Sequence, residues 1–466
     1  MIRLRSLLRA TGLAGLLAIA TSASLHFACS SDEPGVPSPP ADGSSVRDAG
    51  PDARRDATPV TDAEPLIDAG FLADPAIWSP VPNDFGCPLF EARVVPDPFP
   101  PRIWSSCGAG CRVSPALLPI ASAVAVDSAH SGGIFVGGEV YLSFLSAYRA
   151  VRVMVQQVVR LSDAVTVAAT AIRGSPNLCT FGSGVADAPL LVAPFGTEDG
   201  GYTWTFGRVP IEPGKPITWQ SSTIHDPSIS NNRFMFDGAH GVSFASGEIG
   251  LLAGASADAF VVPKTLGTQV FDTAARGALL TVARFSTDGG GVIEGITADA
   301  AVNTLAEMTD ETPVAIAMDG QRVAWITATG PVGDRSYGSY ATTKFHSVPV
   351  VGTKLGTVEH GPVLSTSPGS AANRTLALAG DYAAAIACPP VSAAPDPTCQ
   401  FQVVQLSTKK LWTIGSRPGG NTFTAVLAVS PTEVVLAEVD YPSHPPSGTI
   451  DRIVRVDIAS LDSLGW

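Results

Sequence analysis

Two histidines of this chain stand next to carboxylates, in the dipeptides His225-Asp226 and Glu359-His360. Imidazole and carboxylate groups together form metal sites and acid–base pairs, because the carboxylate orients the ring and stabilises its protonated form. Each dipeptide is therefore a candidate for that chemistry. The structural alternative is a solvated or turn-forming pair in a loop, and it is the interpretation we favour.

The seven cysteines are the other residues that could do chemistry. Cys388 and Cys399 enclose a Pro-rich loop between two apolar runs, which predicts a disulfide across the base of a hairpin. Four further cysteines permit three pairings, and the sequence leaves the choice open. No nearby His or Cys pair completes four ligands beside the Cys-x-x-x-Cys spacing, so we expect a structural bridge there, with no metal and no cofactor. The four residues are Cys87, Cys107, Cys111 and Cys179.

Catalytic signatures are missing from the sequence itself. It contains no H-E-x-x-H, no G-x-S-x-G, no P-loop and no complete G-x-G-x-x-G motif. We therefore predict no catalytic residues.

The N-terminus has the order of an export signal, with Arg3, Arg5 and Arg9 followed by an uncharged apolar stretch that is short for a membrane span. The run Leu25-His26-Phe27-Ala28-Cys29 then resembles the lipobox of bacterial lipoproteins. That resemblance implies cleavage before Cys29, acylation of Cys29 and, because Ser30 follows, an outer-membrane location facing the periplasm or the cell surface. Residues 1–28 are then the signal peptide. The alternative is ordinary cleavage after Ala18-Ile19-Ala20, but lipidation leaves an even set of six cysteines.

Residues 30–75 read as a tether. They hold eight Pro, ten acidic and three basic residues, and Phe71 is their single aromatic. Such a segment cannot bury enough apolar surface to offset the entropy lost on ordering. We expect residues 29–75 to be a lipidated, disordered, acidic tether, with a cleavable pro-segment as the alternative.

Composition favours an all-β fold for the remainder. The 46 Gly and 39 Pro break helices, and from about residue 76 short apolar runs alternate with turn residues. The formal net charge of −13 argues against nucleic-acid partners, because these need basic surface.

A repeat near 49 residues indicates the architecture. Apolar pairs or Val-Pro steps recur along the chain, and a unit of this length with four short strands is one blade of a β-propeller. We predict a seven-bladed propeller over residues 118–466, with residues 76–117 packing on it or closing it. Six blades with one long insertion, or tandem β-sandwiches, are the alternatives. The anchors are Val159, Val209, Val262, Val302, Val348, Val404 and Val454.

Two motifs support the propeller. The segment from Thr197 to Trp204 resembles the Asp-box of sialidase-like and sortilin-like propellers, and residues 286–293 are a degenerate copy. In a tight hairpin an Asp accepts backbone N–H groups, a Gly permits positive φ and a Trp packs under the turn, so the role is structural. Asp319-Gly320 and the strand after it resemble TolB-like propeller repeats. The structural Asp-box residues are Thr197, Asp199, Gly201, Thr203 and Trp204.

These observations predict a non-catalytic, lipid-anchored cell-envelope protein whose propeller is a binding or assembly module. Its partners would be the membrane, through the lipid, and an envelope protein or glycan. The alternative is a sialidase-like glycoside hydrolase or glycan-binding propeller. Arg102 is the residue that would hold a sialoside carboxylate, but Pro101-Arg102-Ile103-Trp104 keeps only Arg-Ile of the sialidase motif.

Overall fold

The computed structural model describes much of the chain between residues 77 and 465, almost all of it as strands. The chain divides into two compact units, and every described residue belongs to the second, Ala63–Trp466. Besides its strands, the described part contains the short 3-10 helix η4 (Ile458–Ser463), and no helix in that part is long and apolar enough to cross a membrane. The described ranges are 77–81, 89–93, 104–115, 124–148, 153–173, 184–185, 190–196, 202–224, 233–236, 240–245, 248–253, 260–261, 269–276, 279–285, 290–297, 302–329, 342–351, 354–364, 376–387, 400–415, 422–439 and 451–465.

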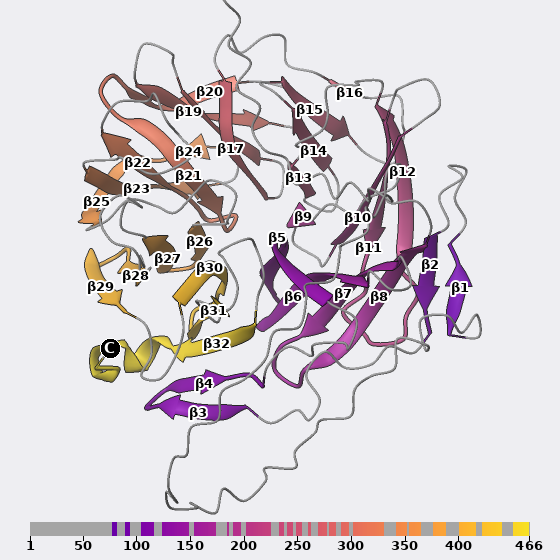
Figure 1. The fold of residues 1–466 in the computed structure, drawn as a ribbon. Coiled ribbons are helices and arrows are strands. Elements are labelled where there is room, and N and C mark those ends of the chain that lie inside the picture. The colour runs from indigo at the N-terminus through magenta and orange to yellow at the C-terminus, as the bar shows by residue number, and fades with distance from the viewer. Residues whose placement is uncertain are drawn as a thin grey trace, which may run out of the picture. The chain divides into compact units, whose positions relative to one another are not determined.

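Seven sheets are built from these strands, and strands that follow one another in sequence mostly pair antiparallel (Figure 1). We number the sheets in chain order. Sheet 1 contains, in spatial order, β1 (Trp78–Pro80), β2 (Leu89–Ala92), β8 (Val165–Arg173), β7 (Val153–Arg160), β6 (Glu139–Tyr148) and β5 (Val124–Val136). Sheet 2 contains β10 (Leu190–Gly196), β11 (Tyr202–Arg208) and β12 (Thr218–Ile224). Sheet 3 contains β16 (Phe260–Val261), β15 (Glu248–Ala253), β14 (His240–Ala245), β13 (Arg233–Phe236) and β9 (Gly184–Val185).

The remaining four sheets follow the same meander. Sheet 4 contains β17 (Gln269–Arg276), β18 (Leu279–Phe285), β19 (Gly291–Thr297) and β20 (Val302–Met308). Sheet 5 contains β21 (Thr312–Met318), β22 (Arg322–Thr329) and β23 (Thr342–Val351), and both β24 (Lys354–Leu355) and β25 (Glu359–Leu364) pair with β23. Sheet 6 contains β26 (Leu376–Ala379), β27 (Tyr382–Ala387), β28 (Gln400–Gln405) and β29 (Lys410–Ile414). Sheet 7 contains β3 (Ser105–Gly108), β4 (Cys111–Val113), β32 (Arg452–Asp457), β31 (Glu433–Val439) and β30 (Thr422–Val429).

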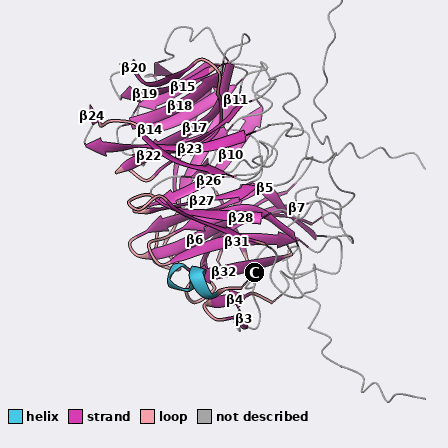
Figure 2. Cartoon of the chain, turned by 90° about the vertical axis from the view of Figure 1, so that its left-hand side faces the viewer, coloured by secondary structure: helices cyan, strands magenta, loops and turns pink. Residues whose placement is uncertain are grey.

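Neighbouring sheets contact one another in a closed series. Trp219 of sheet 2 packs with Tyr141 of sheet 1, and β10 of sheet 2 contacts β9 of sheet 3. The strand β9 contacts β5 and pairs parallel with β13; β13 then contacts β17, β17 contacts β21, β21 contacts β26, β26 contacts β30, and β30 contacts β5. Figure 2 shows the described elements from the side, as strands apart from one short helix. Apolar clusters fill the interfaces whose side chains are described. In one of them, Trp325 and Val348 of sheet 5 pack against Ile293 of sheet 4. Sheets that each pack on two neighbours around a ring define a β-propeller, whereas sandwiches would pack in isolated pairs.

Five of the seven repeat anchors lie in strands of five different sheets. Val159, Val348, Val404 and Val454 lie in β7, β23, β28 and β32, which are the third strands of their meanders, and Val302 begins β20. Val209 directly follows β11, and Val262 lies outside the described residues. Seven blades, with six as the alternative, stays a prediction.

Strands from the segment 76–117 pair with the outer strands of two sheets. Strand β2 pairs with β8, and β4 pairs with β32, so that Val113 lies opposite Val454. The β4 pairing is extended by Ser114, whose N–H donates to the Ile453 carbonyl at 2.9 Å and whose Oγ accepts the Ile453 N–H at 2.9 Å. Sheet 7 therefore combines three strands from the end of the chain with strands from near its start.

A turn aspartate shows why these sequences fold as hairpins. Asp319 lies between β21 and β22, and its Oδ1 accepts the N–H groups of Gln321 and Arg322, both at 2.9 Å. Gly320 has a φ of +87°, which suits glycine because it has no Cβ. Asp319 Oδ2 also accepts the Gly380 N–H at 2.6 Å, so this turn joins sheet 5 to sheet 6.

Candidate functional site

Most of the predicted site residues lie outside the described residues. These are the lipidation site Cys29, the disulfide candidates Cys388 and Cys399, the dipeptide His225-Asp226, Arg102, and the Asp-box residues Thr197, Asp199 and Gly201. Thr203 and Trp204 lie in β11, which pairs antiparallel with β10 so that Gly196 faces Tyr202. The Asp-box segment therefore joins two strands of a hairpin, and the degenerate copy likewise joins β18 to β19.

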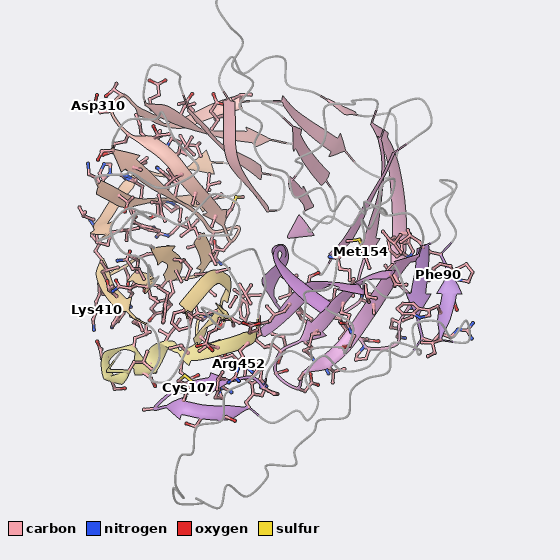
Figure 3. The ribbon with its side chains drawn as sticks, in the orientation of Figure 1. Phe90, Cys107, Met154, Asp310, Lys410 and Arg452 are labelled. Carbon is pink, nitrogen blue, oxygen red and sulfur yellow. A yellow bond between two sulfur atoms is a disulfide. The ribbon has the colours of Figure 1, made fainter. Side chains whose placement is uncertain are left out.

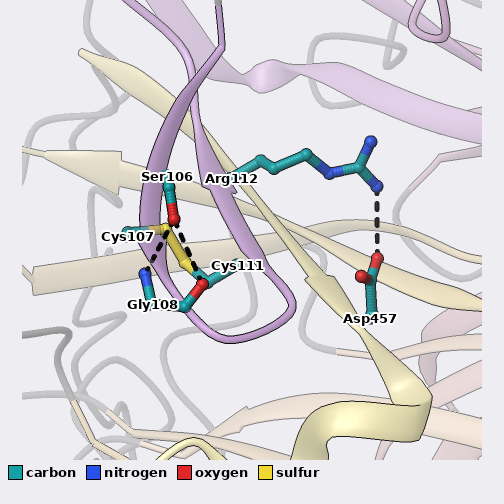
Figure 4. The surroundings of a disulfide bond; sticks show 6 residues. All are labelled: Ser106, Cys107, Gly108, Cys111, Arg112 and Asp457. Atoms are coloured by element: carbon teal, nitrogen blue, oxygen red, sulfur yellow. Dashed lines mark hydrogen bonds and ion pairs between the residues drawn. A yellow bond between two sulfur atoms is a disulfide. The ribbon is translucent and has the colours of Figure 1, made fainter.

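The two cysteines that lie within the described ranges are bonded to each other. Cys107 and Cys111 make a disulfide that links β3 to β4, with 5.0 Å between the Cα atoms (Figure 4). Cys111 is buried, and Arg112 beside it forms an ion pair with Asp457 at 3.1 Å. Of the three pairings that the sequence left open, the structure contains the one with a local Cys107–Cys111 bridge, and its place in a hairpin is structural.

A buried ion pair fixes the same sheet. The Arg455 guanidinium donates to both carboxylate oxygens of Glu433, at 2.9 and 2.7 Å, and to the Leu161 carbonyl of sheet 1 at 3.2 Å. Trp104 covers the guanidinium, with 5.4 Å between its ring centroid and Arg455 Cζ. Cys107 and Arg452 mark this region in Figure 3. The charged groups of Arg455 and Glu433 are paired with each other, so we interpret this ion pair as a structural link between the first and last sheets.

The strongest candidate site is a row of aromatic side chains across sheet 5. Trp325 of β22 lies opposite His346 of β23, and His346 lies opposite His360 of β25. The Trp325 and His346 rings stack at 5.6 Å, and the His346 and His360 rings meet edge to face at 5.2 Å. His360, one of the two sequence candidates, is thereby brought next to a second histidine.

Polar contacts hold His346 on both ring nitrogens. Its Nε2 lies 2.8 Å from the Thr327 hydroxyl, and its Nδ1 lies 3.0 Å from Nδ1 of His360. The Thr327 hydroxyl donates to Glu311 at 2.7 Å, and Lys344 forms an ion pair with the other oxygen of that carboxylate. We call Glu311, Thr327, Lys344, His346 and His360 the histidine cluster.

The hydrogen-bond network assigns the tautomer of His346. Because the Thr327 hydrogen points at Glu311, the Thr327 oxygen must accept, and His346 Nε2 must carry the proton. The Nδ1 of His346 is then an acceptor, and His360 donates to it from its own Nδ1. The cluster is thus a directed chain of hydrogen bonds from exposed His360 to Glu311.

Burial decides the charges in the cluster. Burial lowers the pKa of His346 to about 4, and this outweighs the nearby Glu311 carboxylate, which acts to raise it. Burial acts to raise the pKa of Glu311, but hydrogen bonds from Lys344 and Thr327 outweigh it and keep that pKa below its ordinary value. His346 is therefore neutral at pH 7, and Glu311 is ionised beside Lys344.

Accessibility limits what the cluster can do. Thr327 is 1% exposed and His346 is 6% exposed, whereas His360 lies on the outermost strand of the sheet and is exposed. A substrate would meet His360 but not the Thr327 hydroxyl, so the geometry suits ligand binding at the paired rings better than nucleophilic catalysis. Sequence reasoning found His360 and missed His346, Thr327, Lys344 and Glu311, because no local motif marks them.

No protein-family model and no curated protein sequence matches this chain. Among solved structures, it is similar to the β-propeller domain of Myceliophteria thermophila Cps50 (Swd1), with 11% identity, 68% of this chain and 93% of that chain covered, and a TM-score of 0.41.

Two further structures extend the comparison. The β-propeller domain of the Trilobed protease from Pyrococcus furiosus, described as having an open velcro topology, has 8% identity, covers 74% of this chain and 99% of its own, and gives a TM-score of 0.41. A putative TolB from Agrobacterium tumefaciens has 14% identity, covers 57% and 86%, and gives 0.30. At these values the propeller assignment rests on the strand pairing and sheet contacts of the chain itself.

Proposed function

We propose that this chain is a lipid-anchored cell-envelope protein whose propeller serves as a non-catalytic binding or assembly module. The observation that carries the proposal is the attachment of strands β1–β4, which follow the predicted tether in sequence and pair on the outer strands β8 and β32. An anchor that joins the propeller at the outer strands of its sheets leaves the first strand of each sheet, and the loops connected to it, available to a partner. Propellers offer such surfaces as default binding places.

The histidine cluster supports a role without catalysis. Its Thr327 hydroxyl is closed to solvent, and the hydroxyl hydrogen is donated to Glu311. The acidic composition fits an extended tether more than a nucleic-acid partner.

The anchor is tested by mass spectrometry of the membrane-extracted protein, compared with the variant Cys29→Ser. We expect the wild-type chain to begin at an acylated Cys29 and the variant to lose its membrane association. An unacylated N-terminus downstream of residue 20 contradicts the anchor.

The binding role is tested separately, with immobilised Cys29→Ser protein exposed to detergent-solubilised envelope. Because this variant lacks the acylation site, a stoichiometric protein partner that it retains must be held by the protein portion. Retention of a saccharide instead would favour the glycan class. Turnover of a fluorogenic sialoside that is lost in Arg102→Ala would overturn the non-catalytic proposal and favour the hydrolase.

A further inference from the structure

The geometry of the histidine cluster points to a metal site at the paired rings. We propose that His346 and His360 together bind one divalent transition-metal ion through their Nδ1 atoms, with solvent completing the coordination. Imidazole is a common ligand for such ions. The inference concerns this surface of sheet 5 alone and does not depend on the anchor or on a partner.

The first argument is distance. Two nitrogen ligands, each about 2.0–2.1 Å from a metal and at right angles to one another, lie about 2.9 Å apart. The two Nδ1 atoms are 3.0 Å apart. This separation is that of the hydrogen bond between the rings, so a small rotation of His360 can bring both Nδ1 lone pairs onto one ion. Among divalent first-row ions, a nitrogen site binds Cu²⁺ most tightly.

The second argument is the fixed orientation of His346. Metal-binding histidines almost always donate their second ring N–H to a carboxylate, carbonyl or water, which fixes the ring and its tautomer. His346 Nε2 donates to Thr327, and Thr327 donates to Glu311. The lone pair of His346 Nδ1 is therefore already directed at His360, and the Trp325 ring stacked on His346 restricts its rotation.

The third argument is access. His360 is exposed on the outermost strand, so an ion can arrive from solvent and His360 can turn to receive it. On binding, the His360 proton moves from Nδ1 to Nε2 through solvent, and the number of protons on the two rings does not change. The described residues hold no group of three or more His, Cys, Asp or Glu side chains placed for a metal, so two histidines and water form the site.

Titration of the full-length, detergent-solubilised protein with Cu²⁺, Ni²⁺ or Zn²⁺ tests the site. We expect one Cu²⁺ per chain, bound more tightly than Zn²⁺, with pulsed electron paramagnetic resonance showing two imidazole nitrogen ligands. His360→Ala should weaken Cu²⁺ binding by about tenfold or more and leave one imidazole in the spectrum. Because His360 is exposed, this variant should fold.

Two further variants separate coordination from a general effect on the sheet. Thr327→Val removes the acceptor that fixes the His346 tautomer and should weaken Cu²⁺ binding by about tenfold while His360 remains. Glu359→Gln, the residue before His360 in the same strand, alters an ion pair with Arg322 and should leave Cu²⁺ affinity unchanged. Equal Cu²⁺ affinity in the wild type and in His360→Ala, or a wild-type spectrum with one imidazole, would overturn the proposal.

Discussion

Gly290 occupies the glycine position of the degenerate Asp-box and has a φ of +85°. A Cβ built at this residue would lie 2.3 Å from the Met308 carbonyl oxygen and 2.8 Å from that of Thr309. Both neighbours are backbone atoms, at the end of β20 and in the residue that follows it, and moving them would disturb the packing of the chain there.

We therefore expect Gly290→Ala to lower the free energy of unfolding by at least about 2 kcal/mol, from backbone strain and the clash together. Gly214→Ala is the matched control, because Gly214 has a φ of +77° and nothing within 4 Å of the added Cβ. The control should cost only about 1 kcal/mol. Equal losses in chemical denaturation would show that close approach to β20 contributes nothing.

His346 should make the stability of the metal-free protein depend on pH. Its pKa is about 4 in the folded protein and about 6.5 for an ordinary solvated histidine, so the unfolded chain binds the additional proton first as the pH falls. The free energy of unfolding should decrease between about pH 6.5 and pH 4, by up to about 3 kcal/mol from this residue. The charged or titratable groups facing it are Glu311, Lys344 and His360.

Denaturation curves across this pH range for the wild type and for His346→Gln test the effect. The amide keeps much of the shape and polarity of the imidazole but does not titrate, so its curve should be flatter. Parallel curves for the two proteins would assign the pH dependence to other groups.

At the scale of elements, the Arg455–Glu433 pair connects the last sheet to the first. Removing one partner of a buried pair leaves an uncompensated charge, so Arg455→Ala should lower the free energy of unfolding by about 3–5 kcal/mol. Replacing both residues, as in Arg455→Met with Glu433→Leu, should cost less than the single change. Lys215→Ala is the control, since Lys215 and Glu212 form an exposed pair that contributes about 0–1 kcal/mol. A decrease in the free energy of unfolding no larger than that of the control would contradict this structural link.

The elements were predictable where the signal is local. Alternating Val residues, turn glycines and Asp319-Gly320 predict strands and hairpins, and five of the seven repeat anchors lie in strands of five different sheets. The histidine cluster could not be predicted from the sequence. His346 and His360 are neighbours only because of the register between β23 and β25, which contains an irregularity, and Glu311 lies one residue before β21. Register depends on tertiary packing rather than on residue type.

For the whole molecule, the feature to test is closure through β4, the pairing by which a strand from near the start of the chain completes the last sheet on β32. A chain lacking residues 105–113 loses the strand that covers β32, so amide exchange in β32 should accelerate and the thermal midpoint should fall. A chain lacking the predicted tether, residues 30–75, is the control and should keep the wild-type midpoint. Unchanged exchange in β32 after the first deletion would show that the strand is dispensable.

That closure also constrains when the protein can finish folding. The Ser114–Ile453 hydrogen bond joins residues 339 positions apart, so β4, one of the earliest strands to be synthesised, pairs with β3 alone until nearly the whole chain exists. Contacts this distant in sequence form late and slowly, and an unpaired strand edge invites aggregation in the meantime. A ribosome stalled before residue 452 should therefore carry a nascent chain with β4 open to proteolysis, and release of the last residues should be the event that protects it.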